Sequence, residues 1–93
     1  MPAPLTALKG IGPTTVAWLE AVGLGDEASL RAAGAVEAFR RLKAAFPNKV
    51  SWNALYALHA ALAGVHWNVF PAEVKRQMRE EVLARGPLPG LRP

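Results

Sequence analysis

The chain has 93 residues, no cysteine, two histidines and a formal net charge of +4. Its length suits one small domain, and a hydrophobic fraction of 52% is enough to form a core, which argues against general disorder. The absence of cysteine excludes disulfide bonds and thiolate metal sites, and with only two histidines we expect neither a metal site nor a cofactor.

The sequence gives no sign of a membrane or secretory route. No apolar run reaches the roughly 18 residues that a membrane span needs. The N-terminus, residues 1–4, has no charged region followed by an apolar segment, so we expect no signal peptide, no membrane contact and a cytoplasmic location. The single Gln, few Asn and abundant Ala, Arg and Pro are typical of a thermophile, although GC-rich coding produces the same bias.

The first predicted elements are a short helix over residues 4–9 and a second helix over 13–22, joined by Gly10-Ile11-Gly12. Glycine tolerates the positive φ angles of a tight reversal, and it has no Cβ to keep a phosphate away. Pro13 fits the first turn of a helix, where its missing N–H is not needed. This is the layout of a helix-hairpin-helix, a module that often binds nucleic-acid backbones.

The next two predicted helices, over 26–33 and 35–45, are separated by Gly34. Asp26 is predicted to cap the first, and Leu30 is its apolar anchor. The second helix is predicted to turn Val36, Phe39 and Leu42 inward. The order helix, glycine, helix thus repeats the first unit, although this second connection has one glycine in place of two.

The last two predicted helices cover residues 52–63 and 71–85. The first should be central because it is apolar all round, with Ser51 as its cap and Leu55, Leu58 and Leu62 buried. The second is predicted to bury residues at a spacing of four, namely Val74, Met78 and Val82. We therefore expect an all-α compact bundle of about five to six helices with a helix-hairpin-helix-like N-terminal half. Residues 1–85 should form a single domain, followed by a flexible Pro/Gly tail over 86–93.

Three blocks of this sequence together resemble the C-terminal domain of the TfoX/Sxy family of bacterial competence regulators. They are LKGIGPTTVAWLEAVGL (8–24), LRAAGAVEAFRRLKAA (30–45) and NALYALHAALAGVHWN (53–68). The resemblance covers about residues 5–71 and implies an all-helical, helix-hairpin-helix-like fold. It also implies a role in regulating DNA-uptake genes, alongside the cyclic-AMP receptor protein in some bacteria. Because the chain begins almost at the hairpin, we expect a stand-alone C-terminal domain.

The hairpin is the first candidate binding site. Free backbone amides at the start of the second helix would meet an anion favoured by the helix dipole. A lysine adds charge, and threonine hydroxyls can donate to phosphate oxygens. The residues concerned are Lys9, Gly10, Ile11, Gly12, Thr14 and Thr15. The alternative is a structural corner that packs Ile11 inward. DNA-binding hairpins often carry a basic residue just after the second glycine, where this chain has Pro13, Thr14 and Thr15.

The second candidate is the densest basic group, formed by Arg40, Arg41 and Lys43. These side chains could reach a second phosphate strand, or they could form an ordinary solvated face. In the last helix, basic and acidic residues alternate, which predicts pairing within the helix rather than a binding stripe.

No catalytic constellation is present. His59 and His66 lack a third ligand nearby, and no Ser or Thr has a His and a carboxylate at a recognisable nucleophile spacing. We therefore expect a non-catalytic interaction module rather than an enzyme. Its leading predicted partner is the nucleic-acid backbone, as duplex DNA bound weakly and without sequence preference. The alternative is a protein-interaction or adaptor domain whose hairpin is only structural. The basic charge fits the first interpretation, but a charge of +4 is ordinary for a small domain.

Overall fold

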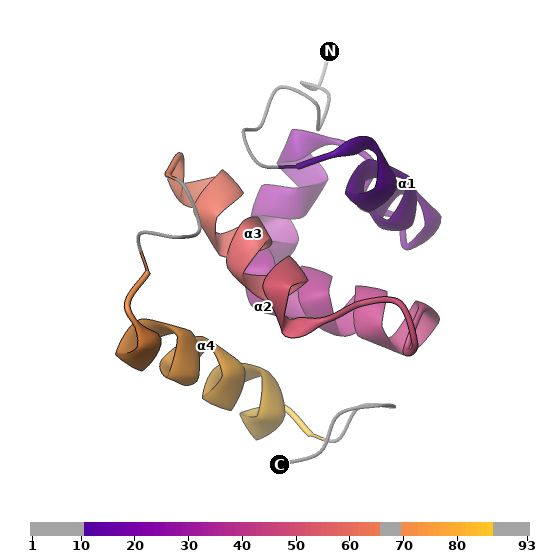
Figure 1. The fold of residues 1–93 in the computed structure, drawn as a ribbon. Helices are drawn as coiled ribbons and strands as arrows, with labels where there is room; N and C mark the ends of the chain where they lie inside the picture. Colours follow the sequence, from indigo (N-terminus) through magenta and orange to yellow (C-terminus); the bar gives the residue numbers. More distant parts are fainter. Residues whose placement is uncertain (1–10, 66–69, 87–93) are drawn as a thin grey trace.

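The structure is a computed structural model that describes residues 11–65 and 70–86. These residues form four helices and no strand: α1 (Pro13–Ala21), α2 (Glu27–Ala45), α3 (Trp52–Ala63) and α4 (Ala72–Ala84). In Figure 1, α1 and α4 lie at opposite sides of the molecule, with α2 and α3 between them. Helix α2 contacts each of the other three helices, α3 most and α1 least, and α3 also packs against α4. The all-α prediction is therefore confirmed.

The described residues hold fewer helices than the five to six predicted. The segment predicted over residues 4–9 lies outside them, as do residues 87–93 of the predicted tail. The third and fourth predicted helices are joined in one element, α2, in which two helical segments meet at the non-helical Gly34. Gly34 has φ 82° and ψ 163°, a conformation that a side chain would strain. The two helical segments predicted on either side of Gly34 are therefore present and meet at a kink, whereas a second hairpin between them is not confirmed.

Local signals place most of the helix ends. Asp26 caps α2 as predicted, because its Oδ1 accepts a hydrogen bond from the Ser29 amide at 2.7 Å. Ser51 occupies the corresponding position of α3, but its side chain makes no capping bond. The Ala54 amide donates instead to the backbone carbonyl of Ser51, at 3.0 Å. The hydroxyl of Ser51 is thereby left out of the cap, contrary to the prediction.

The core draws on every helix. Its largest fully buried side chains are Leu19, Leu30, Phe39, Leu42, Leu55, Leu58 and Val82. Trp52 stacks on Phe39 with ring centroids 5.3 Å apart, which joins the start of α3 to α2. Three residues predicted to be buried are only partly so: Leu62, in the last turn of α3, and Val74 and Met78 on α4. None of the described helices is both long and apolar enough to cross a membrane.

Candidate nucleic-acid interface

The N-terminus of α1 is the part of the predicted hairpin that the structure describes; Lys9 and Gly10 lie outside it. Ile11 is 9% exposed and belongs to the core, as the structural interpretation of the hairpin requires. Gly12 and Thr14 are exposed, and Thr15 is partly exposed. Because the first amides of a helix have no partner within it, this end of α1 presents N–H groups and hydroxyls on the surface.

Gly12 does not have the special conformation that the hairpin prediction assumed. Its φ is −88° and its ψ is 174°, ordinary extended values. A Cβ built at Gly12 meets nothing within 4 Å. The fold itself therefore tolerates a side chain here, and the expectation of a positive φ at Gly12 is wrong.

Lys43, from the predicted basic group, is buried, with 7% of its surface exposed. Its ammonium donates to the carbonyls of Pro47, at 2.8 Å, and Val50, at 2.5 Å. Both carbonyls belong to the loop between α2 and α3. Lys43 therefore supplies hydrogen bonds to the carbonyls of this loop and does not present its charge to a ligand.

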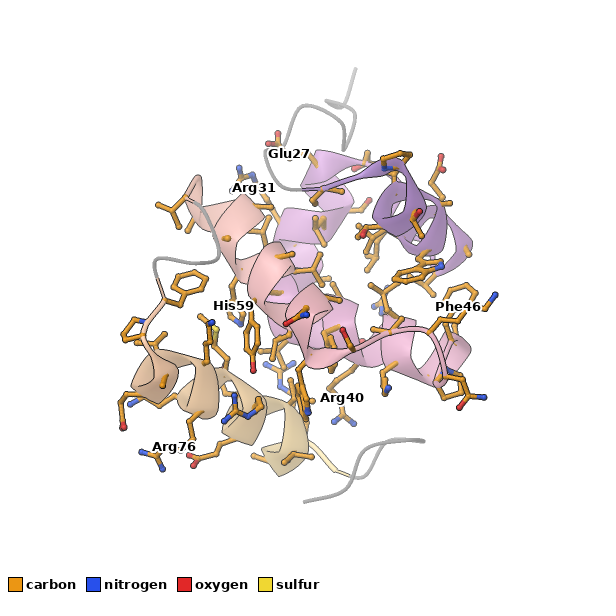
Figure 2. The ribbon with its side chains drawn as sticks, viewed as in Figure 1. Glu27, Arg31, Arg40, Phe46, His59 and Arg76 are labelled. Atoms are coloured by element: carbon orange, nitrogen blue, oxygen red, sulfur yellow. The ribbon has the colours of Figure 1, made fainter. Side chains whose placement is uncertain are left out.

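Arg40 is engaged in the same way at the end of α4. Its guanidinium donates to the carbonyls of Val82, Gly86 and Arg85, at 2.7, 3.0 and 3.3 Å. Figure 2 shows Arg40 beside the C-terminal end of α4, away from α1. A cation suits this place because the last carbonyls of a helix lack partners and carry the negative end of its dipole.

Arg41 is exposed and pairs with a carboxylate on its own helix. Its Nε lies 2.9 Å from Oε2 of Glu37, one turn earlier in α2. The structure thus gives each of the three predicted basic residues a partner within the fold. Mixed charges in α4 also pair as predicted, since Arg76 lies 2.6 Å from Glu73 and 3.1 Å from Glu80.

A cleft of about 280 Å³ opens where α1 passes the start of α3. It is lined by Thr15, Trp18, Lys49, Ser51, Asn53, Ala54 and Ala57. The described lining residues include one lysine and no carboxylate. Thr15 comes from α1, Lys49 from the loop between α2 and α3, and Asn53 from the first turn of α3. The cleft therefore gathers polar groups near the N-terminal ends of two helices.

Sequence reasoning missed Lys49, Ser51 and Asn53 as site residues. A signal was present, because a lysine two residues before a helix cap adds positive charge to the positive end of that helix. What the sequence could not show is that α1 packs beside this end of α3. Trp18, which also lines the cleft, stacks on Phe46 at the C-terminal end of α2, with ring centroids 5.8 Å apart, and so joins α1 to the end of α2.

The described part of the chain holds no group of three or more His, Asp or Glu side chains placed to bind a metal ion. His66, considered together with His59, lies outside it. The Nε2 atom of His59 is buried without a hydrogen-bond partner among the described residues. Burial lowers the pKa of His59 below its ordinary value, and the carboxylate of Glu81 opposes this shift.

Comparison with known families matches residues 1–82 to the TfoX C-terminal domain. The chain belongs to the TfoX C-terminal domain family. This TfoX C-terminal domain is also similar to a solved structure, the crystal structure of an uncharacterized protein from Listeria monocytogenes. The two share 26% sequence identity and a TM-score of 0.76, over 89% of this chain and 93% of the other. No curated protein matches the chain.

Proposed function

We propose that this TfoX C-terminal domain is a non-catalytic interaction module that contacts the nucleic-acid backbone weakly and without sequence preference. The observation that carries the proposal is the cleft between α1 and α3, with its single lysine, its polar side chains and its lack of carboxylates among the described residues. The resemblance to competence regulators implies a role in regulating DNA-uptake genes, and such a role is compatible with contact to DNA.

The chemistry of the cleft suits phosphate oxygens. Hydroxyls of Thr15 and Ser51 and the amide of Asn53 can donate hydrogen bonds to them, as such side chains do in backbone contacts. Lys49 supplies the positive charge that draws a phosphate in. The exposed amides at the start of α1 extend the same surface, and Lys9 and Gly10 precede it in the sequence.

The surface supports only weak binding. Arg40, Arg41 and Lys43 are engaged within the fold, so the proposed interface no longer includes them. Among the described residues that line the cleft, Lys49 is the cation, and each neutralised phosphate contributes separately to affinity. We therefore expect a dissociation constant on the order of 10⁻⁴–10⁻⁶ M at physiological salt, the range of non-specific binding.

The test is fluorescence anisotropy of the domain with labelled DNA duplexes of two unrelated sequences at several salt concentrations. Backbone contact predicts similar affinity for both duplexes and a steep loss of binding as salt rises, because bound phosphates release counterions. Absence of binding at low salt would contradict the proposal. It would favour the alternative, a protein-interaction domain in which the N-terminus of α1 only completes the fold.

A further inference from the structure

Two cations of α4 lie around one tyrosine of α3. Arg79 donates from Nη1 to the hydroxyl of Tyr56 at 2.6 Å. The ammonium of Lys75 lies 5.2 Å from the centroid of the same ring, within the range of a cation–π contact. Lys75 and Arg79 are one helical turn apart on α4, and both are partly exposed. The junction of α3 and α4 thus presents two positive charges side by side at the surface.

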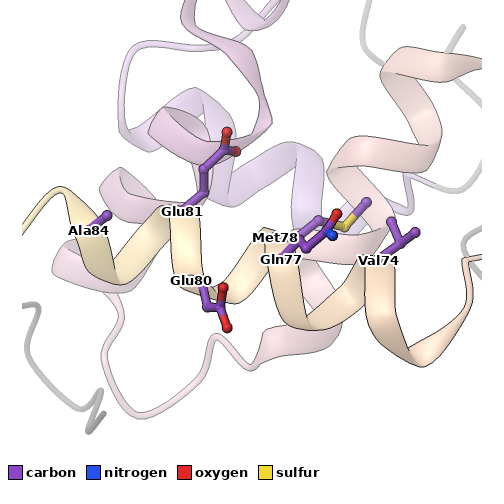
Figure 3. A pocket seen from close by; sticks show the side chains of 6 residues that line it. All are labelled: Val74, Gln77, Met78, Glu80, Glu81 and Ala84. Carbon is purple, nitrogen blue, oxygen red and sulfur yellow. The ribbon is translucent and has the colours of Figure 1, made fainter.

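The carboxylates of α4 lie on other sides of this helix. Glu73 and Glu80 both pair with Arg76, at 2.6 and 3.1 Å. Glu81 follows Arg79 by two residues, which places it about 160° around the helix from Arg79 at 3.6 residues per turn. Figure 3 shows the pocket that Glu80 and Glu81 line, and neither of the two cations belongs to its lining. Although α4 has as many cations as carboxylates, its charges are therefore separated, and the side next to the tyrosine is positive.

Arg79 is engaged differently from Arg40. The guanidinium of Arg40 donates to three backbone carbonyls at the end of α4. Arg79 makes one hydrogen bond, to an uncharged hydroxyl, and no ion pair within the part of the chain that the structure describes. A guanidinium has five N–H donors in a planar fork that matches the oxygens of a phosphate. Most of the donors of Arg79 therefore remain available to an anion.

Tyr56 also adjoins the cleft between α1 and α3. Asn53, which lines that cleft, is exposed and lies three residues before Tyr56. Side chains three residues apart are neighbours on the surface of a helix, with about 5–6 Å between their Cβ atoms. Figure 1 shows α3 in front of α2, with α1 on one side of it and α4 on the other. The cleft and the two cations thus flank the N-terminal half of α3.

We propose that Arg79 and Lys75 form a second contact to the nucleic-acid backbone, which crosses the N-terminal half of α3 from the cleft to α4. This inference rests on the proposed function and extends its interface to a third helix. Successive phosphates of one strand are spaced by about 3.4 Å along the duplex axis. Because an α-helix with its side chains is about 10–12 Å wide, a duplex seated in the cleft brings further phosphates to the far side of α3.

Tyr56 is a positioning residue in this contact. Its ring is buried, with 6% of the residue exposed, so it does not meet the ligand itself. Its hydroxyl holds the guanidinium of Arg79 in place and leaves the positive charge unneutralised. Orienting the guanidinium before binding reduces the entropy that the phosphate contact costs. Loss of the hydroxyl should therefore weaken affinity, while the number of phosphates neutralised stays the same.

The test is fluorescence anisotropy of the wild-type domain and its variants with one labelled DNA duplex at several salt concentrations. Arg79→Gln should weaken binding and reduce the slope of log affinity against log salt by about 0.9, the contribution of one phosphate. Arg79→Lys keeps the charge, so its slope should stay close to that of the wild type. Tyr56→Phe should lower affinity by about twofold to tenfold, the effect of one hydrogen bond, with the slope unchanged.

The matched control is Arg76→Gln. It makes the same change three residues earlier on α4, at a side chain that pairs with Glu73 and Glu80, and its slope should equal that of the wild type. Circular dichroism and thermal melting check that every variant is folded. A labelled glutamate-rich peptide tests for an acidic protein as the ligand, and the domain should bind this peptide more weakly than the duplex.

The possible outcomes separate this inference from the proposed function. Absence of duplex binding by the wild-type domain at low salt would contradict both. Duplex binding that depends on Lys49 but keeps its slope in Arg79→Gln would overturn the second contact alone. Equal loss of slope in Arg79→Gln and Arg76→Gln would also overturn it, because net charge alone would then set the affinity. Binding of the glutamate-rich peptide that Arg79→Gln abolishes, with duplex binding unchanged, would assign the two cations to an acidic protein instead.

Discussion

Arg40 on α2 donates from Nη1 to the carbonyl of Val82 in the last turn of α4, at 2.7 Å. The same guanidinium reaches two further carbonyls after that turn, those of Arg85 and Gly86. One side chain thereby caps α4 and fastens it to the helix that contacts every other element. Arg31 serves α3 similarly, because it donates to the carbonyl of Leu62 at 3.1 Å.

We expect Arg40→Met to destabilise the domain by about 1–3 kcal/mol, the cost of removing a charged donor from partly buried carbonyls. Methionine keeps much of the aliphatic length, so the loss reports the hydrogen bonds. Urea denaturation measures the free energy of unfolding, and hydrogen exchange should show that α4 amides lose the most protection. The control is Arg41→Met, next in sequence but exposed and paired only with Glu37, which should change stability by less than about 0.5 kcal/mol. Equal effects of the two variants would contradict the capping role.

The contribution of α3 to the hydrophobic core can be tested with two leucines of this helix. Leu58 is fully buried, whereas Leu62 is only partly buried. Leu58→Ala should therefore cost about 2–5 kcal/mol, as large-to-small changes in a core do, and Leu62→Ala distinctly less. Denaturant unfolding of both variants measures the difference. A loss of less than about 1 kcal/mol in Leu58→Ala would show that this face of α3 does not form the core.

His59 makes the stability of the domain depend on pH. Its pKa is lowered in the folded state by burial, so at mildly acidic pH the unfolded state binds the proton more readily. Stability should therefore fall as pH drops below about 6.5, the ordinary pKa of histidine. His59→Leu removes this contribution and the unpartnered Nε2 atom. As the pH falls from about 7.5 to about 5.5, the stability of this variant relative to the wild type should rise. A difference that stays constant with pH in His59→Leu would refute the assignment.

Much of the fold could be predicted from the sequence because it rests on local signals. Asp26, Gly34 and Gly64 act within a few residues of their own positions, so the start of α2, its bend and the end of α3 follow from residue type. The buried stripe Val36, Phe39 and Leu42 follows from helical spacing. Whether Gly34 reverses the chain or only bends it depends on how both halves of α2 pack, and spacing alone does not contain that information.

The candidate site was less predictable because it depends on contacts between distant segments. In the sequence, Arg40 and Lys43 cannot be distinguished from cations that face solvent. Their use becomes visible only when the end of α4 and the α2–α3 loop are seen beside them. Lys49 and Thr15 are 34 residues apart and line one cleft only because α1 lies beside the start of α3.

The most direct test of the proposed nucleic-acid contact is the salt dependence of duplex binding by Lys49→Ala, compared with Arg76→Ala. Both variants remove one positive charge from an exposed side chain, but only Lys49 lines the cleft between α1 and α3. Fluorescence anisotropy with one labelled duplex at several salt concentrations gives the slope of log affinity against log salt. We expect Lys49→Ala to weaken binding and to reduce this slope by about one, while Arg76→Ala leaves the slope unchanged. Equal slopes for wild type and Lys49→Ala would contradict the account.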